Sequence, residues 1–371
     1  MLAAATSAGA QGTLSTQGFG YPPGELSSRA LGTGGGLGLF DPQSSINPAS
    51  IGTAGAPLLF LQYEPEFRRL SSGGQTQKTT TSRFPLAVAS VPITSKGTIA
   101  VSVSTLLDRS WQTTTTREEV VAGDKATLTE TVRSIGAIND IRLAGAWVAN
   151  DFIQLGIAGH VFTGQNRLLF SQTFPDSLRF IPVSQVSNLD YTGSAVSGGV
   201  VIRPTSVFSL ALSGRKGLDL NARAGDTIVS TAKIPDRYGA AISYGGIPGS
   251  TVSAQVGRDL WSSLNGLGSD EARAVDAWDV GGGIETLGPK ILERTILIRL
   301  GARYRTLPFL ASGSEVRELS FAGGFGAQFS RNRAAFDVTL QHSSRSPDGS
   351  GTLGDIHERA YTLSFGLRVR P

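Results

Sequence analysis

The sequence predicts an all-β protein, a fourteen-stranded antiparallel transmembrane β-barrel with a small N-terminal plug in its lumen. Three observations predict the barrel: a composition typical of strands, apolar–polar alternation over segments long enough to cross a bilayer, and connections that alternate between short and long. The chain has 371 residues, of which 47 are Gly, 17 are Pro and none is Cys. It contains no apolar run of about 18 residues, so we expect no membrane-spanning helix.

The composition also excludes several classes of protein. Only 17% of residues are charged, and Ser, Thr, Gly, Val and aromatic residues, which favour strands, are common. A soluble protein of this length normally shows helical periodicity and more Lys and Glu. The net charge of +4 is too small and too dispersed to indicate a nucleic-acid partner. We expect no cofactor and no metal ion.

The N-terminal residues 1–10 are predicted to be the remnant of a secretory signal peptide. Ala8-Gly9-Ala10 before Gln11 fits a small-x-small cleavage site. Because the basic start of such a signal is missing, we expect the true start of the precursor to lie upstream. We assign residues 11–55 to the plug and residues 56–371 to the barrel.

Alternation of apolar and polar residues is clearest near the end of the chain. Ile298, Leu300 and Tyr304 alternate with Arg299 and Arg303. One apolar face per strand is typical of a membrane barrel, in which the other face points into the lumen. Replacing Ile298 with Arg should therefore impair assembly, and replacing Arg299 with Ile should be tolerated. The expected strands are 57–70, 80–93, 97–108, 137–149, 152–163, 193–203, 206–214, 231–246, 250–261, 276–287, 293–305, 316–330, 333–343 and 357–370.

The connections between these strands favour an outer-membrane barrel over a soluble sandwich. Short turns are expected near 92–97, 150–151, 204–205, 246–250 and 331–332. Long loops are expected at 109–136, 164–192, 215–230, 262–275 and 344–356. Short turns at one rim and long external loops at the other are the pattern of bacterial outer-membrane barrels. An even number of strands would put both termini at the rim of short turns, in the periplasm.

The stretch from Gly34 to Ala49, GGGLGLFDPQSSINPA, resembles the N-terminal plug signature of the FadL/TodX (OmpP1) family. In that family, small residues lead into Asp-Pro, Ser and Asn-Pro-Ala just before the first barrel strand. Residues 232–239, AKIPDRYG, and 298–305, IRLGARYR, are similar to two later family motifs. The order and spacing of these motifs hold from about residue 30 to the C-terminus.

This resemblance implies an outer-membrane channel for passive uptake of hydrophobic compounds, such as fatty-acid-like or aromatic molecules. Ligand would be captured by the loops, gated by the plug and released laterally. The implied partners are a hydrophobic small molecule, outer-membrane lipid and the barrel-assembly machinery. Asn47-Pro48-Ala49 would lie against an inward kink of the third strand, at about 97–108. The plug and gate residues are Asp41, Pro42, Asn47, Pro48 and Ala49.

Two groups of residues are candidates for ligand binding. Residues 164–192 are unusually apolar for a loop, which indicates a capture surface or a lid with its own core. Arg299 and Arg303 should face the lumen, where they could bind a carboxylate; alternatively they hold the plug by ion pairs, with Asp41 as a natural partner. The residues proposed to contact ligand are Leu169, Phe170, Phe174, Phe180, Arg299 and Arg303.

Two departures from the family keep a second function open. The chain ends at Arg370-Pro371 instead of an aromatic residue, and both barrel and plug are short. A PorV-like shuttle or assembly protein, whose loops bind a secretion-system protein, would have the same fold. We do not expect an enzyme. His160 should face the lumen as one of its polar side chains, and His342 should lie on the lipid face near the loop-side rim.

Overall fold

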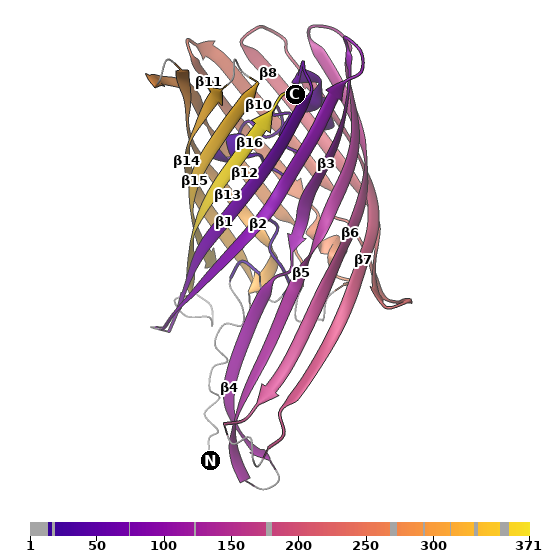
Figure 1. The fold of residues 1–371 in the computed structure, drawn as a ribbon, viewed down its shortest axis with the longest axis vertical. Coiled ribbons are helices and arrows are strands. Elements are labelled where there is room, and N and C mark those ends of the chain that lie inside the picture. Colours follow the sequence, from indigo (N-terminus) through magenta and orange to yellow (C-terminus); the bar gives the residue numbers. More distant parts are fainter. Residues whose placement is uncertain are drawn as a thin grey trace.

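A computed structural model describes residues 14–16, 19–73, 75–121, 124–175, 180–267, 273–291, 294–311, 313–329, 333–348 and 356–371 (Figure 1). The expected signal remnant, residues 1–10, lies outside the described residues. Within them, no helix has the length and apolar character needed to cross a membrane. No cluster of three or more potential metal ligands occurs in this part of the chain either.

Fourteen of the described strands close into one antiparallel barrel, as the sequence predicts. Closure is made by β1 and β16, with Leu59 opposite Val369 and Ser71 opposite His357. The barrel strands are β1 (Leu58–Ser72), β2 (Gln75–Pro92), β3 (Gly97–Asp108), β5 (Asp124–Val148), β6 (Ile153–Thr173), β7 (Val183–Ile202), β8 (Phe208–Ala224), β10 (Arg237–Ile247), β11 (Ser250–Asp259), β12 (Ala277–Ile291), β13 (Arg294–Ala311), β14 (Ser314–Phe329), β15 (Ala334–Pro347) and β16 (His357–Val369).

Side chains alternate between the two faces of the wall as expected. On β13, Ile298 and Leu300 are 37% and 60% exposed on the outer face, whereas Arg299 is 1% exposed. We call the end of the barrel with short turns, such as residues 93–96, the turn rim, and the opposite end the loop rim. The C-terminal end of β16 lies at the turn rim, where the amide of Arg370 bonds to the carbonyl of Arg333 (2.6 Å).

Much of what was predicted as long loops is instead strand. Residues 109–136, 164–192 and 215–230 are largely ladder-paired, because β5, β6 and β7 run beyond the barrel (Figure 1). Two further strands, β4 (Trp111–Val121) and β9 (Thr227–Lys233), add hairpins to this extension by pairing with β5 and β8. Both faces of these projecting strands lie outside the membrane, so neither face is consistently apolar. Apolar–polar alternation therefore could not reveal them.

The N-terminal segment, which we define as residues 14–53, runs through the inside of the barrel (Figure 1). The amide of Ser15 contacts Glu358 near the loop rim, and the segment ends beside β5, β6 and β7. Thus the first described residues do not lie at the turn rim, where both ends of the chain were expected. The helices are α1 (Ser28–Gly32) and η1 (Pro48–Thr53) in the segment, and η2 (Trp261–Leu264) after β11.

The outward face of β13 generates a first prediction. Ile298→Arg should destabilise the inserted barrel by about 2 to 4 kcal/mol, because an arginine near the bilayer midplane is poorly solvated. The measurement is the fraction of heat-modifiable folded protein after insertion into lipid vesicles. Thr76→Arg, at an exposed outer position near the loop rim, is the control and should fold normally. Equal folding of the two variants would contradict the assignment of the lipid face.

Candidate functional site

Asp41 organises the part of the N-terminal segment between Ser27 and Ser44. Its buried carboxylate accepts hydrogen bonds from the hydroxyls of Ser27 and Ser44 and the amide of Gln43. Ser27 is the N-cap of α1, with its Oγ accepting from the amide of Ala30 (3.1 Å). The nearest cation is Arg29, whose Nη1 lies 3.9 Å from Asp41. Asp41 therefore holds the segment in shape and is not the partner of Arg299 or Arg303.

Asn47 and Pro48 begin the 3-10 helix η1. The side chain of Asn47 accepts from the amide of Ala49 (3.0 Å) and donates to the carbonyl of Leu39 (2.9 Å). Pro48 follows at the first helical position, where its missing N–H costs nothing. Both hydrogen bonds of the Asn47 side-chain amide are thus made within the segment, and none joins it to the described part of the barrel wall. Pro42 is half-buried beside Asp41.

The N-terminal segment approaches the wall most closely where both sides lack bulky side chains. A Cβ on Gly156 of β6 would overlap the backbone of Ala49, and one on Gly199 of β7 would overlap the Asn47 amide. Asn47 and Ala49 therefore lie against β6 and β7, not against the third strand as the resemblance implied. Gly34, at φ +61°, is packed in the same way against Gly301 of β13.

The wall contains a gap between β2 and β3. Their ladder runs from Pro92–Thr98 to Leu86–Ser104 and then stops, although both strands continue toward the loop rim. Pro85 follows directly on β2 and has no N–H to donate. On the other side, β3 has a register shift between Thr105 and Leu107 in its pairing with β5. The third strand thus carries the irregularity that was expected, at its loop-rim end.

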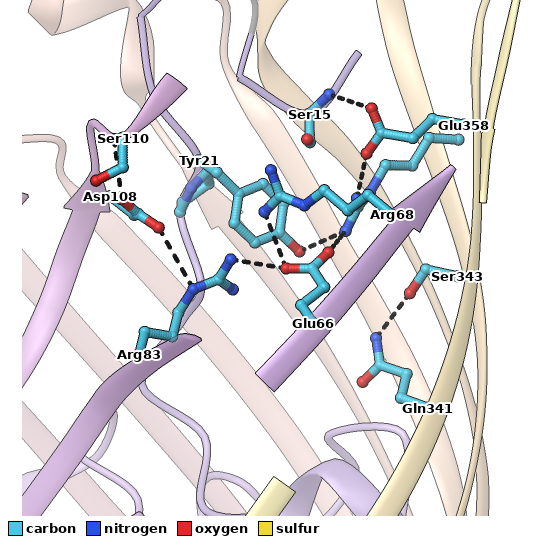
Figure 2. Close-up of polar contacts among 12 residues, drawn as sticks. Ser15, Tyr21, Glu66, Arg68, Arg83, Asp108, Ser110, Gln341, Ser343 and Glu358 are labelled. Carbon is cyan, nitrogen blue, oxygen red and sulfur yellow. Dashed lines mark hydrogen bonds and ion pairs between the residues drawn. The ribbon is translucent and has the colours of Figure 1, made fainter. Parts of the chain in front are cut away.

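Tyr21, not Asn47, covers this gap (Figure 2). Its amide and carbonyl both bond to Asp108 at the end of β3, at 2.7 and 2.8 Å. Arg83 of β2 reaches across the gap to the Asp108 carboxylate (3.4 Å). One residue of the N-terminal segment therefore supplies ladder partners that β2 does not supply, and one ion pair joins the two edges.

The ring of Tyr21 is surrounded by guanidinium groups. The guanidinium carbon of each lies near the ring centroid: that of Arg345 at 4.8 Å, those of Arg68 and Arg305 at 5.0 Å, and that of Arg83 at 5.2 Å. Cations within about 6 Å of an aromatic face are attracted by its quadrupole. The Tyr21 hydroxyl also accepts from Arg345 (3.0 Å) and Arg305 and donates to Glu318 (3.4 Å).

Buried carboxylates balance these arginines. Arg345 alone contacts Glu318 and Glu358 at 2.5 Å and Glu66 at 2.9 Å. Glu66 also bonds to Arg83 (2.7 Å) and Arg68 (2.9 Å), and Figure 2 shows this part of the network around the tyrosine. We call Tyr21 and these charged partners the Tyr21 cluster. Such pairing is required because an isolated buried charge is far more costly than a paired one.

The titration of two residues of the N-terminal segment reflects this environment. Burial raises the pKa of the Tyr21 hydroxyl and outweighs the opposing effect of Arg305 and Arg345, so the hydroxyl keeps its proton. Burial alone would raise the pKa of Glu25, but Arg215, which lies 2.8 Å away, and Arg237 reverse this and lower it. Glu25 is therefore a second anchor of the segment, on the opposite wall from the Tyr21 cluster.

A buried apolar cluster lies beside the gap, toward the loop rim. Phe19 is 3% exposed and packs in a tilted arrangement against Phe309 of β13, with ring centroids 4.5 Å apart. Trp261 of η2 meets the same phenylalanine edge-on at 6.1 Å. The Phe19 cluster, as we call it, comprises Phe19, Leu106, Leu107, Ile138, Phe162, Tyr191, Ala195, Leu220, Ala222, Ala232, Ile234, Trp261, Leu264, Ala274, Ala277 and Phe309.

A small cavity joins the Phe19 cluster to the charged lumen. Its volume is about 40 Å³, with Leu106 and Trp261 on the apolar side and Arg215, Arg237 and Arg303 among the charged residues. This space is too small for a ligand larger than a few water molecules. An organic ligand can enter here only if Phe19 or the surrounding side chains move.

The two arginines predicted to bind a carboxylate already have carboxylate partners. Arg303 makes two bonds to Asp279, at 2.7 and 2.5 Å. Arg299 bonds to Glu285 (2.7 Å) and Asp337 (2.6 Å), and Glu285 also binds Arg29 of the N-terminal segment. This agrees with the alternative of ion pairs that hold the segment. It also reverses the expectation for Arg299→Ile, which would leave buried carboxylates without their cation.

The four apolar candidates from residues 164–192 lie elsewhere. Leu169 and Phe170 are on the projecting part of β6, about 25 Å beyond Phe162 at the usual rise per residue. As neighbours on a strand they point to opposite faces. Phe174 and Phe180, near the end of the β6–β7 hairpin, contact each other with centroids 5.0 Å apart. These residues do not form one site with Arg299 and Arg303.

His160 lies between two polar partners that the sequence did not predict. Its Nδ1 lies 2.8 Å from Asp140 and its Nε2 lies 2.8 Å from the Ser197 hydroxyl. This is the order of groups in a serine hydrolase. However, the backbone amides around Ser197 are in a continuous ladder with β6 and β8, so they cannot act as an oxyanion hole. The series is better explained as a satisfied lumen histidine. His342 faces outward beside Tyr361, as expected.

Sequence reasoning missed the residues at the centre of this site. Phe19 and Tyr21, Glu66, Arg83 and Arg345 come from four separate places in the chain. Only the inward positions of Glu66 and Arg345 could be inferred, from the alternation along β1 and β15. The contribution of Phe19 and Tyr21 depends on how the segment threads the barrel, which leaves no periodic signal.

The charge balance of the Tyr21 cluster gives a second prediction. Glu318→Gln should lower the free energy of unfolding by about 3 to 5 kcal/mol, because it leaves Arg305 and Arg345 short of a buried partner. The measurement is the temperature of loss of the folded, heat-modifiable band. Asp348→Asn removes an exposed pair with Arg317 and should cost less than about 1 kcal/mol. Equal shifts would show that the buried pairs contribute no more than surface pairs.

Comparison with known proteins gives the fold. No protein-family model matches the sequence, and no curated protein matches it. Among solved structures, a Pseudomonas aeruginosa FadL homologue is 12% identical, with a TM-score of 0.60 over 95% of this chain and 99% of that one. Two further solved structures are similar. The CymD monoaromatic hydrocarbon channel is 12% identical, with a TM-score of 0.58 over 93% of this chain and 97% of that one. The Pseudomonas putida toluene transporter TodX is 11% identical, with a TM-score of 0.58 over 94% of this chain and 98% of that one. The chain therefore has the fold of the FadL/TodX outer-membrane barrels.

Proposed function

We propose that this protein is a bacterial outer-membrane channel for passive uptake of hydrophobic compounds, with lateral release through the gap between β2 and β3. The observation that carries the proposal is that the gap adjoins the buried Phe19 cluster and is covered by Tyr21 of the N-terminal segment. A water-filled pore disfavours an apolar solute, whereas an exit through the wall delivers it directly to lipid. The gap thus suits an apolar cargo.

The similar structures support this cargo class. One is described as a toluene transporter and another as a monoaromatic hydrocarbon channel. We transfer only the general class, a fatty-acid-like or aromatic molecule, to this chain. In this proposal the protein has no enzymatic activity, the turn rim faces the periplasm and the barrel-assembly machinery inserts it.

The route we propose has three stages. Phe174 and Phe180, with Leu169 and Phe170 on the adjoining β6, offer the first apolar surface outside the barrel. The compound then displaces Phe19 from Phe309 and occupies the Phe19 cluster. Finally it leaves between Pro85 of β2 and Leu106 of β3, once the contacts of Tyr21 and Arg83 with Asp108 are released. Arg299 and Arg303 act in this route by fixing the segment, through Glu285 and the lumen charges.

The N-terminal residues 11–55 act as the plug in this proposal. Asp41 and Pro42 shape its turn, and Asn47, Pro48 and Ala49 anchor its end against β6 and β7. Since these last contacts are close and buried against glycines of the wall, they are the fixed end. The loop-rim end, with Phe19 and Tyr21, is the part that moves.

A second function is favoured by one feature of the fold. The sheet that projects beyond the barrel ends in β4, which among the described strands pairs only with β5. A strand at the edge of a sheet is a surface on which another chain can add a strand. This supports the alternative of a PorV-like shuttle or assembly protein that binds a secretion-system protein.

A disulfide that ties the plug to the wall tests the uptake proposal. The hydroxyls of Ser28 in α1 and Ser364 in β16 are 2.8 Å apart, and the chain has no cysteine of its own. Ser28→Cys/Ser364→Cys should form a cross-link under oxidation. Because the proposed movement is confined to Phe19 and Tyr21, which precede α1, oxidation should leave uptake of radiolabelled toluene or oleate within about twofold of that of the reduced protein. A loss of about tenfold that reductant restores would show that α1 has to move with the rest of the plug.

The matched control is Ser320→Cys/Ser343→Cys. These hydroxyls are also 2.8 Å apart and buried, but both belong to neighbouring wall strands, β14 and β15. Its oxidation should leave uptake unchanged. Full uptake by the oxidised Ser28–Ser364 variant would restrict any movement to residues before α1. Absence of uptake in the wild-type protein would refute the transport proposal itself.

The phenylalanines of the β6–β7 hairpin distinguish the two functions. Phe170→Ser/Phe174→Ser/Phe180→Ser should raise the ligand concentration needed for half-maximal uptake several-fold, while the folded barrel persists, because these side chains lie outside the wall. Uptake and vesicle insertion are measured on the same preparations. Normal uptake combined with loss of a co-purifying protein would instead support the shuttle.

A further inference from the structure

Three cations lie side by side on the outer face of the barrel near the loop rim. Arg69 of β1 is directly opposite Arg359 of β16 on one side and Lys78 of β2 on the other. All three are exposed. Directly opposed side chains have Cβ atoms about 5 Å apart, and like charges in such positions destabilise a sheet. We call these three residues the basic row.

No carboxylate within the described residues compensates the basic row. Other outward-facing arginines near this rim do have acidic partners: Arg317 pairs with Asp348, and Arg258 with Asp276 at 3.5 Å. The glutamate next in sequence to Arg359 cannot neutralise the row. Glu358 is buried on the inner face of the wall, where it is bound to Arg345. The positive charge of the row is therefore directed outward.

The position of the row relative to the membrane follows from the register. Two residues closer to the turn rim, an unbroken row of rings crosses β14, β15, β16 and β1: Phe321, His342, Tyr361 and Phe67. Phe321, Tyr361 and Phe67 are 57%, 52% and 48% exposed. Aromatic girdles mark the membrane–water interface of transmembrane barrels. Two residues correspond to about 7 Å along a strand, which places the basic row at the level of lipid headgroups.

We propose that the basic row binds the phosphate groups of a phosphorylated membrane lipid, whose acyl chains lie against the aromatic row. Two guanidinium forks and one ammonium group on adjacent strands suit a phosphate, which offers several acceptor oxygens and more than one negative charge. Free phosphate has the same headgroup chemistry. However, the row is convex and exposed, and only a lipid also gains the apolar contact beneath it. This site is independent of the transport proposal and requires only that the barrel lie in a membrane.

The test compares lipid retention by the full chain and its variants. Each protein, folded in a neutral detergent, is titrated with bisphosphorylated lipid A or with the same lipid after removal of both phosphates, and bound lipid is counted by native mass spectrometry. For Arg69→Gln/Lys78→Gln/Arg359→Gln, the apparent Kd for the phosphorylated lipid should rise at least about tenfold. The control Arg117→Gln/Lys125→Gln/Arg133→Gln removes three exposed cations from the projecting hairpin and should change it less than about twofold.

Several results would overturn the proposal. These are unchanged retention by the basic-row variant, equal binding of the dephosphorylated lipid by the wild-type protein, or displacement of the lipid by inorganic phosphate at an equal concentration. If the triple variant fails to give a heat-modifiable barrel, the single variants and Arg69→Lys/Arg359→Lys are tested instead. The conservative double variant should bind the phosphorylated lipid more tightly than Arg69→Gln/Arg359→Gln.

Discussion

The rest of this structure depends on one constraint: backbone groups in a membrane wall must find hydrogen-bond partners within the protein. Thirteen of the fourteen junctions between the described barrel strands meet it with ladders that continue almost to the ends of the shorter strand. The junction of β2 and β3 does not, since its ladder ends at Leu86–Ser104. Pro85 removes one donor, and the bulge in β3 turns Leu106 and Leu107 into the lumen, where both are buried. Tyr21 then supplies the backbone partners for Asp108.

Charge in the lumen follows from the same demand for partners. Inward-facing arginines and glutamates alternate along adjacent strands, so that a buried cation such as Arg345 lies beside buried carboxylates, here Glu318 and Glu358. Arg109 and Arg142 instead bond to the segment through the carbonyls of Phe19 and Ser45. Desolvation makes such pairs poor sources of stability but severe penalties when broken. These ion pairs therefore determine the position of the N-terminal segment more than they stabilise the closed barrel. Arg29, Glu25 and Tyr21 each fit one such position.

The sequence was sufficient for the barrel and for the buried position of Gly34 to Ala49, because both depend on local signals. Alternation at Ile298 and Arg299 reports which face meets lipid, and Pro and Gly report where no ladder can form. It was insufficient for the projecting strands. In the Thr-rich strand at residues 111–121, for example, both faces meet water, so its sequence shows no apolar–polar alternation. It was also insufficient for the contacts of the plug. Asn47 satisfies its amide locally, while Tyr21 reaches β3 only because of the path of the chain through the lumen.

In the proposed uptake route, the spacing of Phe19 and Tyr21 couples capture to release. The two residues are separated by Gly20 alone, yet Phe19 belongs to the apolar cluster and Tyr21 to the charged one. An apolar ligand competes with Phe19 for Phe309 but gains nothing from the arginines around Tyr21. Displacing Phe19 must therefore pull on the backbone that pairs with Asp108, while the contacts of Asn47 and Ala49 with β6 and β7 stay in place. We infer that a ligand opens the gap by moving one short part of the plug, which requires far less energy than expelling the whole segment.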